Sequence, residues 1–446
     1  MPRRPVWFAD AHRWDRYHKE KPPTARSEAA RDRDRILYSS ALLRLSGITQ
    51  VASTEIGASF HSRLTHSLKV AQVARRLAES LKANVPAGAP ARIAKVLDVD
   101  AVEAAALAHD IGHPPFGHLA EEELNDATQG FGGFEGNAQS FRVVTRLSLR
   151  SADYDGLNLT RQTLNGLLKY PWLRDLDHPD REAKWGAYNA DGPAFEWVRE
   201  GRGDGDPRSL EAEIMDWADD VTYAVHDMED FYRAGLVPLD RLCSNQTELD
   251  RFVDSLFVDG DERKRVRPRL GSLTPRDVTK AAKALFGSLL DLDEAYTGDP
   301  LQRRKLKLQS STLIGQYISA LTIADVDPGS GKPLVAIDRR RRAQVAVLKE
   351  LTWFYVINRP SLAVLQQGQR RVIAGLFAAY KDAVERDQLR LFPPFEQQRL
   401  RSAKTDPARL RIIADYIAGM TEERAIEIYR RMHGFSSGSL LDAAAG

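Results

Sequence analysis

The most constraining feature of the sequence is an alanine-rich run that stops abruptly at a group of histidines. Residues 100–108 read DAVEAAALA, a composition typical of a buried α-helix, and Asp100 with Glu103 resembles an N-terminal capping box. Gly112 and the two prolines that soon follow it cannot continue a helix. The run therefore predicts a core helix whose last turn holds the residues immediately before Gly112.

Those last-turn residues include an adjacent histidine and aspartate, His109 and Asp110. A carboxylate beside an apolar helix is costly to bury unless a positive charge compensates it, and a divalent cation provides that compensation. Neutral imidazole is also a good metal ligand. The pair therefore indicates a metal site at the end of the helix, with buried core polar groups as the alternative.

The histidines are concentrated in one part of the chain, since five of the ten lie between residues 61 and 118. His66 continues an apolar stripe through Val70, Val73 and Leu77, which places it on the inward face of a helix near its start. A polar ring in that position needs a hydrogen-bond partner or an ion. His66 is therefore a second candidate ligand.

A third histidine has an acid one helical turn away. His118 and Glu121 are spaced i, i+3, so they share a face if a helix starts at His118. Glu121 would then orient His118 and stabilise its charged form, which is the arrangement that acid/base chemistry needs.

Residues 209–233 predict a helix with an apolar seam and a separate line of four aspartates and one tyrosine. That line consists of Asp216, Asp219, Tyr223, Asp227 and Asp230. A solvated acidic face is the simpler interpretation, but stacked carboxylates repel one another unless cations or donors compensate them. Asp219 is therefore a candidate fourth metal ligand.

The remainder of the chain predicts an all-α protein with at most one short β-hairpin, around residues 327–333. Residues 1–30 form a charged arm, 31–236 a helical core with a loop-rich insert at about 170–208, and 237–446 a helical C-terminal region expected to pack on the core and contribute to oligomerisation. The single cysteine, Cys243, excludes an internal disulfide and favours a reducing compartment. No apolar run is long enough for a signal peptide or a membrane span, so a cytoplasmic protein is expected.

A histidine, a His-Asp pair at a helix end and a distant aspartate together resemble the HD phosphohydrolase superfamily, and in particular its deoxyguanosine triphosphate triphosphohydrolase-like branch. Further blocks similar to that branch occur in order along residues 25–235. They are RDRDRI (31–36), TQV (49–51), RLTHSL (63–68), FEGNAQS (134–140), LKYP (168–171) and ADDVTYAVHD (218–227).

The resemblance implies a role for each candidate residue. His66, His109, Asp110 and Asp219 would hold one divalent ion, with manganese or magnesium expected first and iron, cobalt or nickel as alternatives. Asp219 is preferred to Asp220 because it lies four residues before Tyr223. The catalytic group would be His118 with Glu121 and the nearby His113, and the nucleotide would contact Arg63, Lys169, Tyr170, Tyr223 and Asp227.

The reaction that the resemblance implies is hydrolysis of a deoxynucleoside triphosphate to deoxynucleoside and inorganic triphosphate. It also implies a homo-oligomer, dimer-based or hexameric. Clustered Lys and Arg side chains could bind an allosteric dNTP or single-stranded DNA, and no membrane partner is expected. Gly136 departs from relatives that carry histidine there, so a histidine contact to the phosphates is missing. The sequence gives no residue that reads the base.

Two other functions remain open at this stage. One is a different HD phosphohydrolase, acting on monophosphates, cyclic nucleotides or guanosine tetraphosphate. The other is a nucleotide-sensing or nucleic-acid-binding regulator, favoured by three basic clusters at residues 263–265, 303–305 and 339–342. The net charge of +2 gives no global support for nucleic-acid binding, and solvated helix faces explain such clusters equally well.

Overall fold

The computed structural model describes residues 11–21, 25–50, 62–201, 207–257, 270–289, 292–326 and 331–435. The turn of the expected hairpin (327–330), the basic cluster 263–265 and His61 lie outside these ranges. Within them the protein is helical apart from one two-stranded sheet, which confirms the all-α prediction.

The helices of the N-terminal half surround the histidine-rich segment. They are α1 (Glu28–Leu37), α2 (Ser40–Arg44), α3 (Arg63–Ala83), α4 (Ala89–Val96), α5 (Val99–Ala108), α6 (His118–Thr128), α7 (Gly136–Arg142), α8 (Arg161–Leu167), α9 (Pro179–Ala183), α10 (Gly192–Arg199) and α11 (Leu210–Arg233). The stretch 170–208, expected to be loops, thus also holds α9 and α10, both of which begin with a proline in the first turn, where it favours helix initiation.

The C-terminal half adds more helices and the sheet. They are α12 (Leu239–Ser244), α13 (Gln246–Ser255), α15 (Pro275–Phe286), α16 (Pro300–Ile318), β1 (Leu321–Ile323), β2 (Val335–Ile337), α17 (Arg339–Thr352), α18 (Pro360–Glu385), α19 (Pro394–Ser402), α20 (Asp406–Ala418) and α21 (Glu422–Met432). The strands β1 and β2 pair antiparallel, with Thr322 opposite Ala336, so the expected hairpin is confirmed.

The helix that carries the His-Asp pair begins earlier than its sequence suggested. Its N-cap is Asp98, whose side chain accepts from Ala101 N, so the capping-box interpretation of Asp100 and Glu103 is wrong. Those two acids instead accept hydrogen bonds from Arg75 on α3, at 2.8 and 2.7 Å. Asp100 and Glu103 therefore link α5 to α3 and do not cap their own helix.

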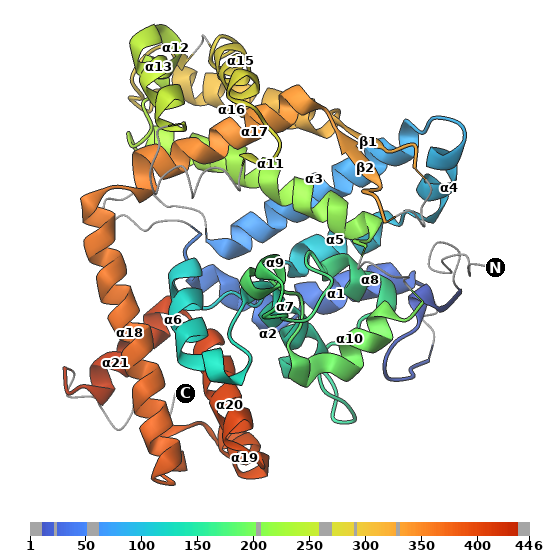
Figure 1. Ribbon diagram of the computed structural model, residues 1–446, viewed down its shortest axis with the longest axis vertical. Helices are drawn as coiled ribbons and strands as arrows, with labels where there is room; N and C mark the ends of the chain where they lie inside the picture. Colours follow the sequence, from blue (N-terminus) through green and yellow to red (C-terminus); the bar gives the residue numbers. More distant parts are fainter. Residues whose placement is uncertain are drawn as a thin grey trace.

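Three long-range helix pairings hold the site in place. The helices α3, α5 and α11 pack on one another in the larger hydrophobic core, which also includes α16 and α17 (Figure 1). A second core lies under α6 and contains α18, α20 and α21, drawn in orange and red at the lower left of the same view. Helices of the C-terminal half therefore contribute to both cores.

The N-terminal residues that the structure describes pack on the core. Arg16 pairs with Asp32, which is fully buried, and its guanidinium also donates to Asn158 O at 2.6 Å. No helix among the described residues is long and apolar enough to cross a membrane.

Candidate metal centre and active-site cavity

The four residues expected to bind a metal come from three helices that meet. His66 lies in the first turn of α3, below the N-cap Ser62. His109 is the C-cap of α5, Asp110 follows it in the turn, and Asp219 projects from the middle of α11. His66, His109 and Asp110 are buried, with relative exposures of 4–7%.

The structure brings these side chains together. Asp219 Oδ1 lies 3.1 Å from His66 Nε2 and 3.6 Å from His109 Nε2, and His109 Nε2 lies 3.5 Å from Asp110 Oδ1. Neighbouring ligands of an ion held at about 2.1 Å are roughly 3 Å apart, so this spacing is close to that of a coordination sphere. The solvated-face interpretation of Asp219 is therefore wrong.

The chemistry of the donor set fits a divalent cation. His109 Nδ1 lies 2.7 Å from Ala106 O, which can only accept, so Nδ1 carries the proton and Nε2 is left to bind an ion. His109 Nε2 is buried and accepts no hydrogen bond within the part of the chain that the structure describes. Two imidazoles, two carboxylates and a divalent ion have zero net charge, which suits a buried site.

The pKa shifts within the cluster also indicate that the site favours positive charge. Burial lowers the pKa of His109, but Asp110 and Asp219 outweigh burial and raise it to about 9. Burial raises the pKa of Asp219, yet the bonds to His109 and His66 hold it well below its usual range. The two carboxylates therefore favour a positive charge beside them.

Arg63 contacts the metal cluster directly. Its Nη1 donates to Asp110 Oδ2 at 2.6 Å, and the side chain is 4% exposed. Arg63 also lines the cavity described below, so it both orients Asp110 and presents positive charge to a ligand.

The expected catalytic pair also forms. A helix starts at His118, as predicted, and His118 Nδ1 is hydrogen-bonded to Glu121. Glu121 Oε1 accepts from Gly136 N at 2.5 Å, which fixes the carboxylate. Burial raises the pKa of Glu121, but Lys184 and His118 hold it well below its usual range. Because His118 Nδ1 is hydrogen-bonded to Glu121, Nε2 is the nitrogen available to contact a ligand.

His113 lies between the two groups. Its Nδ1 is 3.1 Å from Asp110 Oδ1, and its ring packs edge-on against that of His118 at 5.4 Å between centroids. Burial and the nearby Arg63 lower the pKa of His113, although Asp110 opposes them. His113 therefore connects the metal cluster to the catalytic pair.

The surroundings of Gly136 leave no room for a side chain. A Cβ on Gly136 would lie 2.6 Å from Glu121 Oε1 and 3.2 Å from His113 Nε2. A side chain at this position would displace the Glu121 carboxylate, so glycine belongs to this arrangement of the catalytic pair.

The residues expected to contact the nucleotide divide into two sets. Lys169, Tyr170 and Tyr223 line a cavity of about 760 Å³ together with Arg63, His109, Asp110 and Asp219. Lys169 Nζ lies 2.6 Å from Asp216 and 3.6 Å from Asp219, which raise its pKa well above the usual value although burial opposes them. Asp227 does not line this cavity; it is buried, and burial and Asp230 raise its pKa well above normal.

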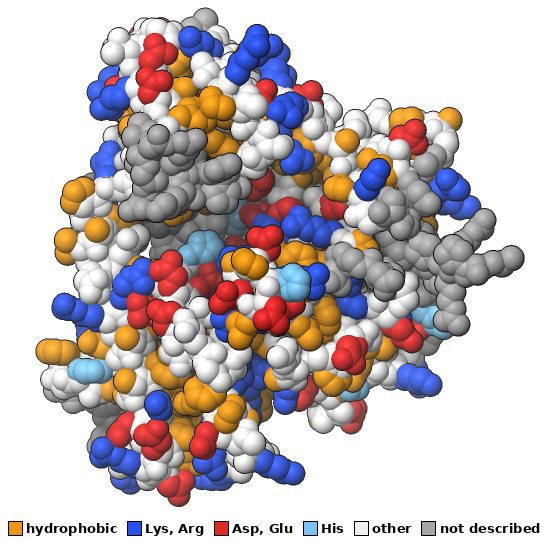
Figure 2. Space-filling model, in the orientation of Figure 1, with side chains coloured by type: hydrophobic (Ala, Val, Ile, Leu, Met, Phe, Trp, Pro, Cys, Tyr) orange, Lys and Arg blue, Asp and Glu red, His pale blue; other side chains and the backbone are white. Residues whose placement is uncertain are grey.

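The cavity has a second wall that the sequence did not reveal. Figure 2 shows acidic, basic and histidine side chains gathered around the hollow in the middle of this face. Lining residues absent from the sequence analysis are Asn137, Lys184, Lys349, Trp353, Asn358, Gln366, Gln369 and Arg370. Five of the eight come from α17, α18 and the π-helical turn η8 (Trp353–Ile357) between them, and Asn358 lies in the connection from η8 to α18, a region without a recognisable motif.

A helical core that joins a histidine, a His-Asp pair and a distant aspartate has the architecture of the HD-domain phosphohydrolases. The HD domain model matches residues 63–224, which contain all four cluster residues. The phosphohydrolase-associated domain model matches residues 335–431, which contain the part of the second wall contributed by α17, η8 and α18.

Curated relatives match nearly the whole chain. A deoxyguanosinetriphosphate triphosphohydrolase-like protein of Streptomyces coelicolor is 38% identical over 433 residues, covering 92% of this chain and 93% of the relative. Proteins of the same name from Corynebacterium efficiens and a Shewanella species are 34% and 31% identical, with at least 94% of each chain covered. The chain therefore belongs to the deoxyguanosinetriphosphate triphosphohydrolase-like family of HD phosphohydrolases.

Proposed function

We propose that the protein is a metal-dependent deoxynucleoside triphosphate triphosphohydrolase. The observation that carries the proposal is that His109, Asp110 and Asp219 line one cavity of about 760 Å³ together with His118, whose ring is hydrogen-bonded to Glu121. That volume suits a nucleotide, and the names of the relatives point to the same class of substrate.

In this reaction a water oxygen bonds to the α-phosphorus, the bond from phosphorus to the 5′ oxygen breaks, and a proton reaches the departing oxygen. His66, His109, Asp110 and Asp219 would hold a divalent ion, which would supply Lewis-acid polarisation of the α-phosphate. Manganese or magnesium suits this mixed nitrogen and oxygen donor set.

The side chains of this protein perform the remaining tasks. His118 moves a proton through Nε2, and Glu121 holds the ring in place through the hydrogen bond to Nδ1. Arg63, Lys169 and Lys184 offset the charge of the triphosphate. Tyr170 and Tyr223 border the sugar, where contact with the ring would exclude a 2′-hydroxyl.

The experiment is a product analysis. Purified protein is incubated with each of the four dNTPs and the four NTPs with manganese or magnesium, and products are resolved by ion-exchange chromatography. Triphosphate and deoxynucleoside in equal amounts are expected. Orthophosphate, pyrophosphate or a nucleoside monophosphate as the first product would replace the proposal with another HD phosphohydrolase reaction.

The remaining parts of the proposal concern organisation. The division near residue 236 is supported by the two family models, which fall on either side of it. The proposal includes a homo-oligomeric state. Light scattering after size-exclusion chromatography tests it. Cytoplasmic location is supported by a single, unpaired cysteine, Cys243.

A further inference from the structure

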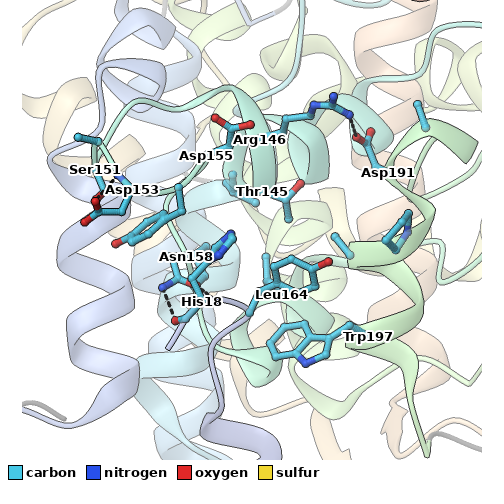
Figure 3. Close-up of a pocket in the computed structure, with 18 residues that line it drawn as sticks. His18, Thr145, Arg146, Ser151, Asp153, Asp155, Asn158, Leu164, Asp191 and Trp197 are labelled. Atoms are coloured by element: carbon cyan, nitrogen blue, oxygen red, sulfur yellow. Dashed lines mark hydrogen bonds and ion pairs between the residues drawn. The ribbon is translucent and has the colours of Figure 1, made fainter. Parts of the chain in front are cut away.

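A second cavity, of about 530 Å³, lies between the segment 151–158 and helix α10 (Figure 3). None of the residues that line it also lines the catalytic cavity. Its floor includes Val144 and Thr145 of the π-helical turn η5 (Val143–Leu147), which directly follows α7. Single π-turns of this kind are frequent at functional sites.

Aromatic rings form the walls of this second cavity. Trp197 meets Tyr17 edge to face at 5.4 Å between centroids, and the guanidinium of Arg161 stacks on Trp197 at 4.7 Å. His18 stacks on Tyr154 at 4.9 Å, with 11° between the ring planes. Such walls favour a flat ring as the ligand.

The charged side chains that line the cavity are mainly acidic. Three aspartates, Asp153, Asp155 and Asp191, line it against one arginine, Arg146. Asp191 is 5% exposed; its Oδ1 accepts from Arg142 at 2.6 Å, whereas its Oδ2 is buried without a hydrogen-bond donor among the described residues. A ligand that fits this wall brings N–H donors and carries no phosphate, because phosphate and carboxylate repel each other.

We propose that this cavity binds an uncharged nucleoside whose base carries an exocyclic amino group. The base would lie against Trp197 and Tyr17, and its amino group would donate to the aspartates. The volume is within the range of small-molecule sites. Deoxynucleosides are also the organic product of the proposed reaction, and only this link depends on the proposed function.

Helix α7 connects the second cavity to the catalytic pair. At its C-terminal end Arg142 bonds Asp191, and at its N-terminal end Gly136 N donates to Glu121. Between them, Ser140 Oγ donates to His109 O at 2.8 Å. A ligand that moves Asp191 or η5 would therefore shift α7, and through α7 it would shift both Glu121 and His109.

The test measures binding directly and needs no turnover. Isothermal titration calorimetry compares deoxyadenosine, deoxyguanosine, deoxycytidine, thymidine, deoxyadenosine monophosphate and spermidine as ligands. The three amino nucleosides are expected to bind more tightly than thymidine and the monophosphate. Photolabelling with 8-azidodeoxyadenosine then locates the site, with label expected on peptides within residues 144–158 and 190–197.

Variants separate this cavity from the catalytic one. Trp197→Ala should weaken nucleoside binding about tenfold, since stacking of a base on an aromatic ring contributes about 1–3 kcal/mol. Asp155→Lys, on the exposed rim, should weaken it without a folding defect, and Glu196→Lys, an exposed acid on α10 outside the cavity, is its matched control. Tyr170→Ala in the catalytic cavity should leave this binding unchanged.

The coupling is tested by hydrogen exchange of the α7 amides with and without deoxyadenosine, where slower exchange is expected. The proposal is overturned if label appears only on the catalytic cavity, if the monophosphate or spermidine binds as tightly as the nucleosides, or if Trp197→Ala and Asp155→Lys both bind normally. Each of these results can be obtained whether or not the protein hydrolyses dNTPs.

Discussion

At the scale of single residues, the site depends on which of two adjacent acids faces the histidines. Asp219 Oδ1 lies near His66 and His109, whereas the neighbouring Asp220 is paired with Lys349 of α17 through its Oδ1, at 2.5 Å. Adjacent residues on a helix point about 100° apart, so one faces the cluster and the other faces α17. The two acids therefore form a natural matched pair for mutation.

We expect Asp219→Asn to lose the bound divalent ion and Asp220→Asn to retain it, because only Asp219 completes the donor set. Elemental analysis of dialysed protein by mass spectrometry measures both. The reverse pattern, with metal lost from Asp220→Asn alone, would show that the ligand assignment is wrong.

We expect His118→Ala to keep metal and substrate affinity while kcat falls about 10²- to 10⁴-fold, the usual contribution of a general acid or base. Steady-state kinetics and metal content check the two parts. His178→Ala is the control, because His178 makes the same i, i+3 contact with an acid, Asp175, on an exposed segment. Equal rates in the two variants would remove His118 from the mechanism.

At the scale of elements, the turn after α5 and helix α7 approach each other so closely that only glycine fits. A Cβ on Gly112 would lie 2.1 Å from Ser140 N and 2.4 Å from Gln139 C, both backbone atoms of α7. Gly112 N also donates to Ser140 Oγ at 3.0 Å. This contact aligns the His-Asp turn with the helix that fixes Glu121.

We therefore expect Gly112→Ala to lower the free energy of unfolding by about 3 kcal/mol, because a backbone collision must be relieved by moving one of the two elements. Denaturation by urea measures the change. Gly130→Ala is the control, since no atom lies within 4 Å of its added Cβ. Similar midpoints for both variants would contradict the close approach.

At the scale of the whole molecule, the N- and C-terminal halves share buried contacts as well as the cavity. Glu213 of α11 accepts hydrogen bonds from Leu334 N and Val335 N, at 2.8 and 2.9 Å, and so ties the core helix to the hairpin. Burial of the Glu213 side chain raises its pKa to about 7, although the two backbone donors and Arg208 oppose it.

This raised pKa predicts a pH dependence of stability. The folded protein keeps a proton that the unfolded chain releases above about pH 4.5, so the free energy of unfolding should fall as pH rises from about 4.5 to about 7. The contribution is at most about 3 kcal/mol. Glu213→Gln should remove this part of the slope in urea titrations, whereas the exposed Glu385→Gln should keep it; equal slopes in Glu213→Gln and wild type would contradict the assignment.

The sequence predicted the position of a side chain correctly where a local pattern determines that position. Helical periodicity placed His66 on the inward face of α3, the Gly-Pro stop placed His109 and Asp110 at the end of α5, and i, i+3 spacing predicted the His118–Glu121 contact. Local patterns gave a wrong prediction where a side chain from another helix competes. Arg75 of α3 binds Asp100 and Glu103, which were expected to form a capping box.

The sequence by itself determined the helical class, which rests on local periodicity, and indicated the family through a series of short motifs, each of which is local in the chain. Only the tertiary structure decided what lies opposite them. Lys184 and Lys349 reach the cavity, and Asp227 stays buried away from it, because helices far apart in sequence pack together. Such packing depends on complementary surfaces of distant segments, and the spacing of residues within one segment does not predict it.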